Sequence, residues 1–255
     1  MLLAVDVGNT NLTIGLFEGQ RRVANWRLKT DPEETVDGWG ALFHNLVALA
    51  GLRMAGVRGF IFSSVVPQLD ASLSGMAGRY LGLEPFQVTA ATPTGLAIRV
   101  ENPAEVGADR IVNSVAAAHR YGCPCIAVDF GTAITFDAIS AERAYLGGVI
   151  CPGIQVSTQA LVRRTARLPQ IEVRKPRSVI GTNTVGSLQS GFYYGMLGML
   201  DGILAEMLGV LGEGTSVVAT GGQASVLAPE SRHVQKVDDG LTLEGLRLIW
   251  ARNRT

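Results

Sequence analysis

The stretch "AVDVGNTNLTIGLF", residues 4–17, decides the fold expected for this chain of 255 residues. Apolar residues lead into Asp6 and Gly8, three small polar residues follow, and apolar and polar residues then alternate. Alternation with a period of two is typical of β-strands, and glycine and asparagine are typical of the turn that joins two of them. We therefore predict strands over residues 2–7 and 12–17, with a carboxylate at the end of the first.

The same pattern occurs again in the second half of the chain, as "CIAVDFGTAITFDAI", residues 125–139. In this internal repeat Asp129 aligns with Asp6, and Gly131 aligns with Gly8. Strand patterns alternate with helical patterns between the two copies, which is typical of an α/β fold. We predict a duplicated α/β domain, with domains at residues 1–115 and 116–255.

The composition limits the possible partners. Twenty-two basic residues balance 22 acidic ones, so there is no cationic excess for a nucleic acid or an anionic membrane. The chain has three cysteines and no pattern of a secretory signal, so we expect a reduced, cytoplasmic protein. Cys123 and Cys125 flank a proline and could bind a metal or be redox active; we favour simple packing at the start of a strand.

Residues 188–212 are the most hydrophobic stretch and are long enough to cross a membrane. Asp201 and Glu206 count against that interpretation, so we predict a buried helix at a domain or subunit interface. Glycines recur on one helical face and would let a second helix approach closely; they are Gly191, Gly195, Gly198 and Gly202.

The two Asp-x-Gly turns suggest a shared chemistry. If the two halves face each other, Asp6 and Asp129 lie on opposite walls of one cleft, and their carboxylates suit Mg²⁺. Asn9, Thr10 and Thr132 offer donors to phosphate oxygens. A single such turn is more simply a hairpin, but two matched copies favour a nucleotide and metal site. A glycine pair, Gly221-Gly222, follows a further strand, and no Walker A motif is present.

Asp109 precedes a clear helical pattern, "GADRIVNSVAAAHRYG". We predict that it caps this helix, and that the helix dipole keeps the carboxylate ionised and lowers its basicity. Capping alone would explain an aspartate at this position, and it does not exclude a second role for the carboxylate. Arg110 is either an anion contact or a surface residue.

Six motifs in order resemble the type III pantothenate kinases of the actin-like, sugar kinase and Hsp70 ATPase superfamily. They are "DVGNTN", "NPAEVGADR", "VDFGTAITFD", "GGVICPG", "GTNTVGSLQSG" and "ATGGQA". The resemblance spans essentially the whole chain. It implies two actin-like (ribonuclease H-like) domains with a nucleotide cleft between them, and ATP-dependent phosphorylation of the 4′-hydroxyl of pantothenate, the first step of coenzyme A synthesis.

The resemblance also implies roles for particular residues. Asp109 is expected to be the general base, Asp129 to support a monovalent cation (K⁺ or NH₄⁺), and Asp6 to hold Mg²⁺ through phosphate or water. The expected substrate contacts are Gly107, Ala108, Asp109, Arg110 and Thr184. The expected ATP contacts are Asp6, Val7, Gly8, Asn9, Thr10, Asn11, Leu12, Thr13, Thr132, Gly221 and Gly222.

The family forms homodimers, which we expect here as well. Many relatives carry a tyrosine near position 100 that contacts substrate, whereas this chain has Arg99 and Val100. Two alternatives remain at this point: a kinase of the same superfamily that acts on another hydroxyl, and a regulatory paralogue without catalysis.

Overall fold

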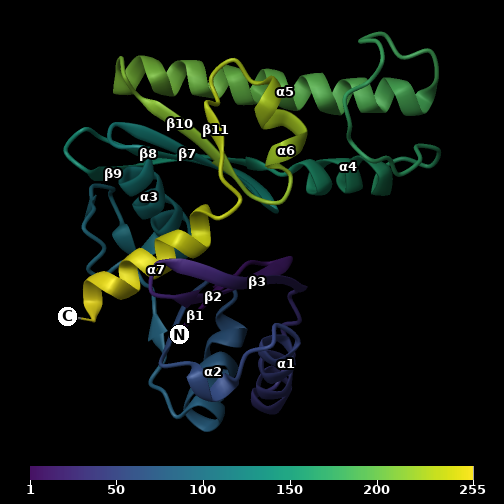
Figure 1. Ribbon diagram of the computed structural model, residues 1–255. Helices are drawn as coiled ribbons and strands as arrows, with labels where there is room; N and C mark the ends of the chain where they lie inside the picture. The colour runs from purple at the N-terminus through teal and green to yellow at the C-terminus, as the bar shows by residue number, and fades with distance from the viewer. Residues whose placement is uncertain (255) are drawn as a thin grey trace. The chain divides into compact units, whose positions relative to one another are not determined.

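A computed structural model describes residues 1–254 and divides the chain into two compact units (Figure 1). Unit 1 consists of Met1–Ala116 together with the C-terminal helix that begins at Leu241, and unit 2 is Ala117–Gly240. The sequence-based division had placed all of residues 116–255 in the second domain. The C-terminal helix instead packs with the N-terminal sheet.

Unit 1 is built on a sheet in the strand order β3-β2-β1-β4-β5. Strand β1 pairs antiparallel with β2 and parallel with β4. Short 3₁₀ turns occur at Met54–Gly56 and Pro103–Glu105, and a π-helical turn at Ala77–Leu81 extends α2. The elements are β1 (Leu2–Val7), β2 (Asn11–Glu18), β3 (Arg21–Lys29), α1 (Val36–Leu49), β4 (Gly59–Ser64), α2 (Pro67–Met76), β5 (Phe86–Gln87), β6 (Ala97–Ile98), α3 (Ala108–Arg120, whose last turn passes into unit 2) and α7 (Leu241–Asn253).

Unit 2 repeats this arrangement, with its strands in the order β11-β10-β7-β8-β9. Strand β7 pairs antiparallel with β8 and parallel with β10, as β1 does with β2 and β4. The predicted duplication of an α/β domain is therefore confirmed. The elements are β7 (Cys125–Phe130), β8 (Ala133–Ile139), β9 (Ala144–Pro152), α4 (Ile154–Arg163), α5 (Thr184–Leu211), β10 (Ser216–Thr220), α6 (Ala224–Leu227), a 3₁₀ turn at Ala228–Glu230, and β11 (Lys236–Val237).

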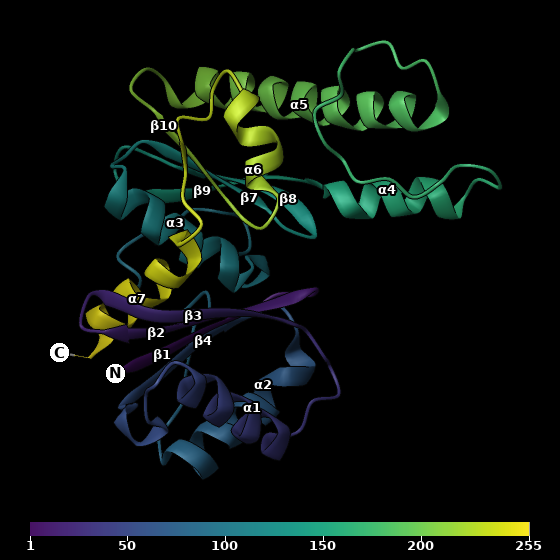
Figure 2. The ribbon, with the colours of Figure 1, turned by 45° about the vertical axis from the view of Figure 1, so that its right-hand side comes forward.

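The two faces of the unit 1 sheet have different coverings. Side chains such as Leu3 and Val5 point into a core with Trp39 and Phe43 of α1. The opposite face carries small residues at Ala4, Gly15 and Gly59, and α7 lies along it (Figure 2). A Cβ atom on Gly59 would lie 2.2 Å from the Trp250 ring, and one on Gly15 would lie 2.9 Å from Leu243. These glycines therefore let α7 approach the strands closely.

In unit 2, Ile126 and Val128 of β7 pack in one core with Tyr193 and Leu200 of α5. Cys125 is fully buried at the start of β7, and burial, followed by the neighbouring Cys123, raises the pKa of its thiol. A buried thiol that resists ionisation suits packing better than metal ligation.

Helix α5 confirms the helix predicted over 188–212 and begins four residues earlier. Within residues 1–254 it is the one helix long and apolar enough to span a membrane, a criterion that core helices also meet. Asp201 is buried on it and accepts hydrogen bonds from Ser231 and Arg232, which attaches the helix to its own unit.

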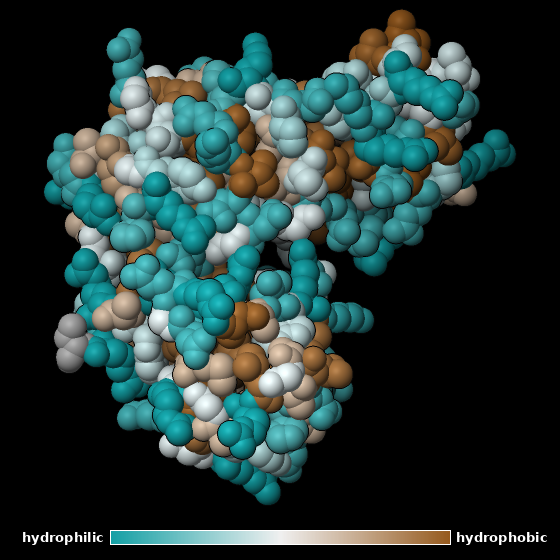
Figure 3. Space-filling model, in the orientation of Figure 1, coloured by the Kyte–Doolittle hydropathy of each residue, from teal (hydrophilic) through white to brown (hydrophobic). Residues whose placement is uncertain are grey.

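The prediction that this helix is buried is only partly right. The recurring glycines of this helix, called the glycine seam from here on, are exposed, and a Cβ atom on any of them would meet no atom within 4 Å; they are Gly191, Gly195, Gly198 and Gly202. Apolar side chains reach the surface over α5 among hydrophilic ones (Figure 3).

Candidate active site

The first polar cluster lies at the carboxyl end of β1. Because β1 and β4 are parallel, Asp6 lies beside Ser63, whose Oγ donates a 2.7 Å hydrogen bond to Asp6 Oδ1. The following turn is closed by the amide of Gly8, which donates to the Asn11 carbonyl at 3.1 Å. The Thr30 hydroxyl donates to the Gly8 carbonyl at 2.6 Å. The Asp6 carboxylate is thus held in a fixed position and remains partly exposed.

The predicted ATP-binding stretch Asp6–Thr13 is not uniform. The side chains of Val7 and Leu12 are fully buried, so only their backbone could reach a ligand. Asn9 and Thr10 are exposed in the turn, and Asn11 and Thr13 are partly exposed. The polar residues of the motif are therefore the ones that solvent or a ligand can reach.

Asp109 lies in the first turn of α3, which begins at Ala108. Its Oδ1 accepts a 2.8 Å hydrogen bond from the Arg110 amide, and the Ile111 amide donates to the Gly107 carbonyl at 3.2 Å. The prediction that Asp109 is the N-cap is therefore wrong: it lies inside the helix rather than before it.

The Asp109 turn lies beside the ends of β1 and β4. A Cβ atom on Gly107 would be 2.5 Å from Asp109 Oδ1 and 3.7 Å from Val65 Cγ1. Val65 follows β4, and its amide donates to the Val7 carbonyl at the end of β1 at 3.0 Å. Unit 1 therefore brings Asp6 and Asp109 to the same end of its sheet, although they are far apart in the sequence.

The electrostatic environment of Asp109 corrects a second expectation. Burial raises its pKa above the ordinary aspartate value, and this outweighs the opposing effects of the Arg110 amide and the Arg110 charge. The sequence predicted a carboxylate of lowered basicity. A carboxylate with a raised pKa is instead a better proton acceptor.

Unit 2 carries a matching cluster at the end of β7. Asp129 is paired in register with Thr135 of β8 and Thr220 of β10. The Gly131 amide donates to the Ala133 carbonyl at 3.0 Å, which closes the turn as Gly8 does in unit 1. The Thr132 carbonyl accepts from the amide of Gly153, just before α4, at 3.0 Å.

The predicted glycine pair lies against this cluster. Gly221 follows β10 with a φ of +95°, and a Cβ atom there would lie 2.3 Å from Asp129 Oδ1. Only glycine allows this approach of the β10 turn to Asp129. Gly222 is exposed.

Thr184 lies elsewhere in unit 2, as the first residue of α5. The preceding Asn183 caps this helix, since its Oδ1 accepts a 2.8 Å hydrogen bond from the Gly186 amide. Thr184 is exposed and borders a hollow of about 510 Å³. The hollow is lined by Leu168, Gly181, Thr182, Asn183, Thr184, Ser187 and Leu188.

Residues that position the site were missed from the sequence. Ser63 and Val65 lie in "FIFSSVVP", which predicts a strand but gives no sign of its neighbours. The sequence feature that could have indicated a site here is the pair of serines, Ser63 and Ser64, at the end of an apolar strand. Among residues 1–254, no three histidine, cysteine, aspartate or glutamate side chains are grouped so as to hold a metal by themselves.

Comparison with known proteins decides the family. A family model described as type III pantothenate kinase matches residues 2–206. The chain belongs to the type III pantothenate kinases. It is 49% identical to the type III pantothenate kinase of Koribacter versatilis, with 100% of this chain and 97% of that protein covered. It is 52% identical to that of Solibacter usitatus, with 99% and 97% covered.

A solved structure supports the fold. The activator of the 2-hydroxyisocaproyl-CoA dehydratase from Clostridium difficile, with bound ADPNP, matches 98% of this chain and 93% of that chain. The TM-score is 0.54 at 13% identity, so this likeness shows the fold alone. As a type III pantothenate kinase, the protein phosphorylates pantothenate in coenzyme A biosynthesis, and its family implies the use of ATP. The two alternatives, a kinase of the same superfamily that acts on another hydroxyl and a non-catalytic regulatory paralogue, are thereby set aside.

Proposed function

We propose that Asp109 is the general base that accepts the proton of the pantothenate hydroxyl. The observation that supports this role is its place beside the ends of β1 and β4, with a pKa raised by burial. A raised pKa increases the affinity of the carboxylate for a proton, and the first turn of α3 holds it in one orientation. Positioning of the attacking oxygen supplies much of the rate in phosphoryl transfer.

We propose that the Asp6–Thr13 turn, Thr132 and the Gly221-Gly222 turn bind the phosphates of ATP. Two matched turns at the ends of β1 and β7 support this role, since glycine keeps the backbone open to phosphate oxygens. The related fold of the Clostridium activator holds a nucleotide analogue.

We propose that Asp6 holds Mg²⁺ through phosphate or water, and that Asp129 supports a monovalent cation. The donor set fits both ions, because carboxylate oxygen next to serine or threonine hydroxyls is a hard ligand environment. Such cations, when bound, neutralise the charge of the phosphates. Mg²⁺ is typically held by one or two carboxylates plus substrate phosphates rather than by a cage of protein ligands.

We propose that Gly107, Arg110 and Thr184 contact pantothenate. The guanidinium of Arg110 suits the carboxylate of this substrate, with which it can form two parallel hydrogen bonds. Ala108 is buried, so its contribution is limited to the backbone.

We further propose that the protein is cytoplasmic and binds neither nucleic acid nor membrane. We propose that it forms a homodimer in which the glycine seam of α5 packs against a second copy of the chain. The seam supports this because it is exposed on the single chain. Light scattering of Gly195→Leu, which places a large side chain on the seam, should show a shift from dimer to monomer; an unchanged dimer would show that the interface lies elsewhere.

The test of the active site is a coupled ATP-turnover assay with Mg²⁺, with and without pantothenate, in potassium and in sodium buffer. We expect turnover to require pantothenate, to rise with potassium, and to fall about 100-fold or more in Asp109→Asn. Asp239→Asn removes an exposed carboxylate in unit 2 and is the matched control. Near-normal turnover of folded Asp109→Asn would show that the base is another residue.

A further inference from the structure

Helices α7 and α3 touch through their backbones at one point in unit 1. A Cβ atom on Gly245 of α7 would lie 2.1 Å from the Val112 carbonyl oxygen and 2.7 Å from Val112 Cγ1. No side chain can occupy that space, so the separation of the two helices here is set by glycine.

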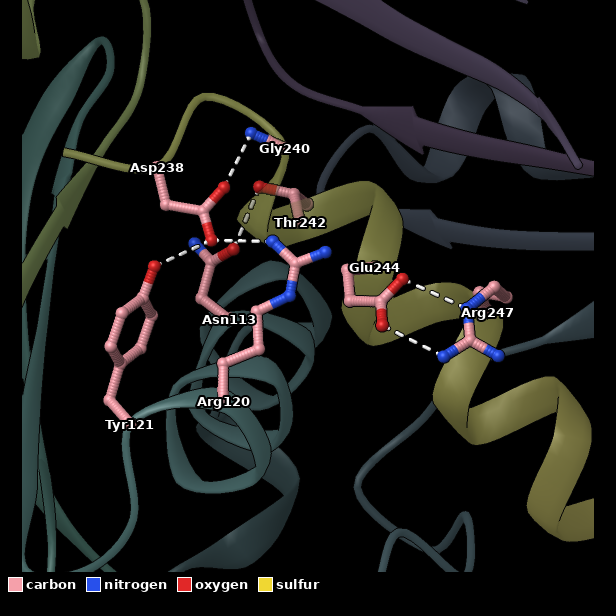
Figure 4. Close-up of polar contacts among 8 residues, drawn as sticks. All are labelled: Asn113, Arg120, Tyr121, Asp238, Gly240, Thr242, Glu244 and Arg247. Atoms are coloured by element: carbon pink, nitrogen blue, oxygen red, sulfur yellow. Dashed lines mark hydrogen bonds and ion pairs between the residues drawn. The ribbon is translucent and has the colours of Figure 1, made fainter. Parts of the chain in front are cut away.

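A buried hydrogen bond lies beside this contact. The Thr242 hydroxyl donates to Asn113 Oδ1 at 2.7 Å, and Asn113 is only 1% exposed. Figure 4 shows the two side chains pointing toward each other from α7 and α3. The hydrogen bond fixes how α3 is rotated about its axis and how far it is displaced along α7.

Both contacts act one helical turn away from Asp109. Val112 and Asn113 follow Asp109 by three and four residues, which places them on the next turn of the same helix. An α-helix is stiff over one turn, so a displacement at Val112 is transmitted to Asp109.

Helix α7 is itself anchored to the sheet that carries Asp6. Leu243 and Leu246 are buried, Leu243 lies against Gly15 of β2, and Trp250 lies against Gly59 of β4. The helix thus connects the sheet bearing one carboxylate to the helix bearing the other.

We propose that Gly245 and Thr242 of α7 are positioning residues for Asp109: they set where the first turn of α3 stands relative to the ends of β1 and β4. This inference rests on the proposed role of Asp109 in proton transfer. Neither residue contacts substrate in this scheme.

The first experiment measures kcat and the KM values for ATP and pantothenate in Gly245→Ala. The new Cβ must move from 2.1 Å to at least 3.0 Å from the Val112 carbonyl oxygen, which displaces α3 by close to an ångström. A misplacement of 1 Å can cost about 100-fold in rate, so we expect kcat to fall by roughly that factor, with KM for ATP changed less than about twofold. Gly78→Ala is the control, because Gly78 is exposed in the π-helical turn of Ala77–Leu81 and a Cβ atom there would meet no atom within 4 Å.

The second experiment uses Thr242→Val, which keeps the size of the side chain, and Thr242→Ser, which loses only the methyl group. Valine removes the hydroxyl, so we expect kcat of Thr242→Val to fall about tenfold. Serine retains the hydroxyl, so we expect kcat of Thr242→Ser to stay close to that of the wild type. This pair decides the inference if Gly245→Ala does not fold. Equal kcat in the two variants and wild type would overturn it.

Asp109→Asn is measured in parallel. If Asp109→Asn keeps wild-type turnover, the proposed base is wrong and the positioning inference falls with it. If Asp109→Asn loses turnover while folded Gly245→Ala and Thr242→Val keep theirs, only the positioning inference is overturned. A fall in kcat that matches the loss of folded protein, measured by circular dichroism, would overturn it as well.

Discussion

Replacing Gly221 by alanine should both destabilise unit 2 and disturb Asp129. The residue has a φ of +95°, and its Cβ would lie 2.3 Å from Asp129 Oδ1 and 2.6 Å from the Phe130 amide nitrogen. Real Cβ contacts are essentially never below 3.0 Å, so the turn and the carboxylate must separate by at least about 0.7 Å. The Asp129 side chain can rotate away, but the Phe130 backbone cannot.

The cost has two parts. Holding alanine at a positive φ costs about 1–3 kcal/mol, and the steric overlap adds a further 1–3 kcal/mol or so. For a chain of this size 1 kcal/mol lowers Tm by roughly 2–4 °C, so a fall of roughly 4–24 °C is expected. Displacement of Asp129 should also lower kcat and weaken the response to potassium.

The assays are thermal unfolding by circular dichroism and ATP turnover titrated with potassium chloride. Gly214→Ala is the control, because Gly214 also has a positive φ, +78°, but a Cβ there would meet no atom within 4 Å. Gly214→Ala should lower Tm only by the cost of holding alanine at a positive φ, without the cost of steric overlap. Its turnover should respond to potassium as that of the wild type does. The reasoning is refuted if Gly221→Ala and Gly214→Ala have the same Tm and the same potassium response.

Three further changes test other parts of the structure. The pKa of Asp109 is raised in the folded protein, so ionisation of this carboxyl opposes folding above its unfolded pKa of about 3.9. Asp109→Asn should therefore be more stable than wild type at pH 7 and equally stable near pH 3. Urea unfolding at the two pH values measures this difference. Ser63→Ala removes the 2.7 Å hydrogen bond to the Asp6 carboxylate, so steady-state kinetics should show a raised KM for ATP and calorimetry a stability loss of about 1.5–3 kcal/mol. Burial alone would raise the pKa of Asp201, but hydrogen bonds from Ser231 and Arg232 outweigh burial and lower it. Asp201→Asn should therefore be less stable than wild type at pH 7. Urea unfolding should show this difference disappear as the pH falls through the lowered pKa of Asp201 in the folded protein.

Most of the strand framework could be predicted from local pattern. Strands β1, β2 and β7 and the turns after Asp6 and Asp129 agree with the prediction within a residue or two, because period-two alternation and turn chemistry act over a few residues. The β-rich stretch "FQVT", residues 86–89, predicts a strand of four residues, but only Phe86 and Gln87 pair with β4.

The predictions that were wrong concern features that depend on contacts between residues far apart in the sequence. Nothing in residues 241–253 indicates which sheet they cover, because the complementary Gly15 and Gly59 lie about 200 residues away. The raised pKa of Asp109 arises from burial in the folded unit, which the local helix pattern cannot report. The spacing of the α5 glycines predicts a helix face that another helix can approach closely. It does not indicate whether that helix belongs to the same chain or to a second copy.

The position of α7 has a consequence for the order of events on the ribosome. Unit 2 is one continuous segment, whereas unit 1 is completed by residues made after all of unit 2. The nascent N-terminal sheet therefore exposes the face of Ala4, Gly15 and Gly59 until α7 leaves the exit tunnel, at a synthesis rate of about 5–20 residues per second. Residues 117–240 can complete their fold first, so a segment translated after all of unit 2 both closes the first unit and, by the contact inferred above, positions Asp109.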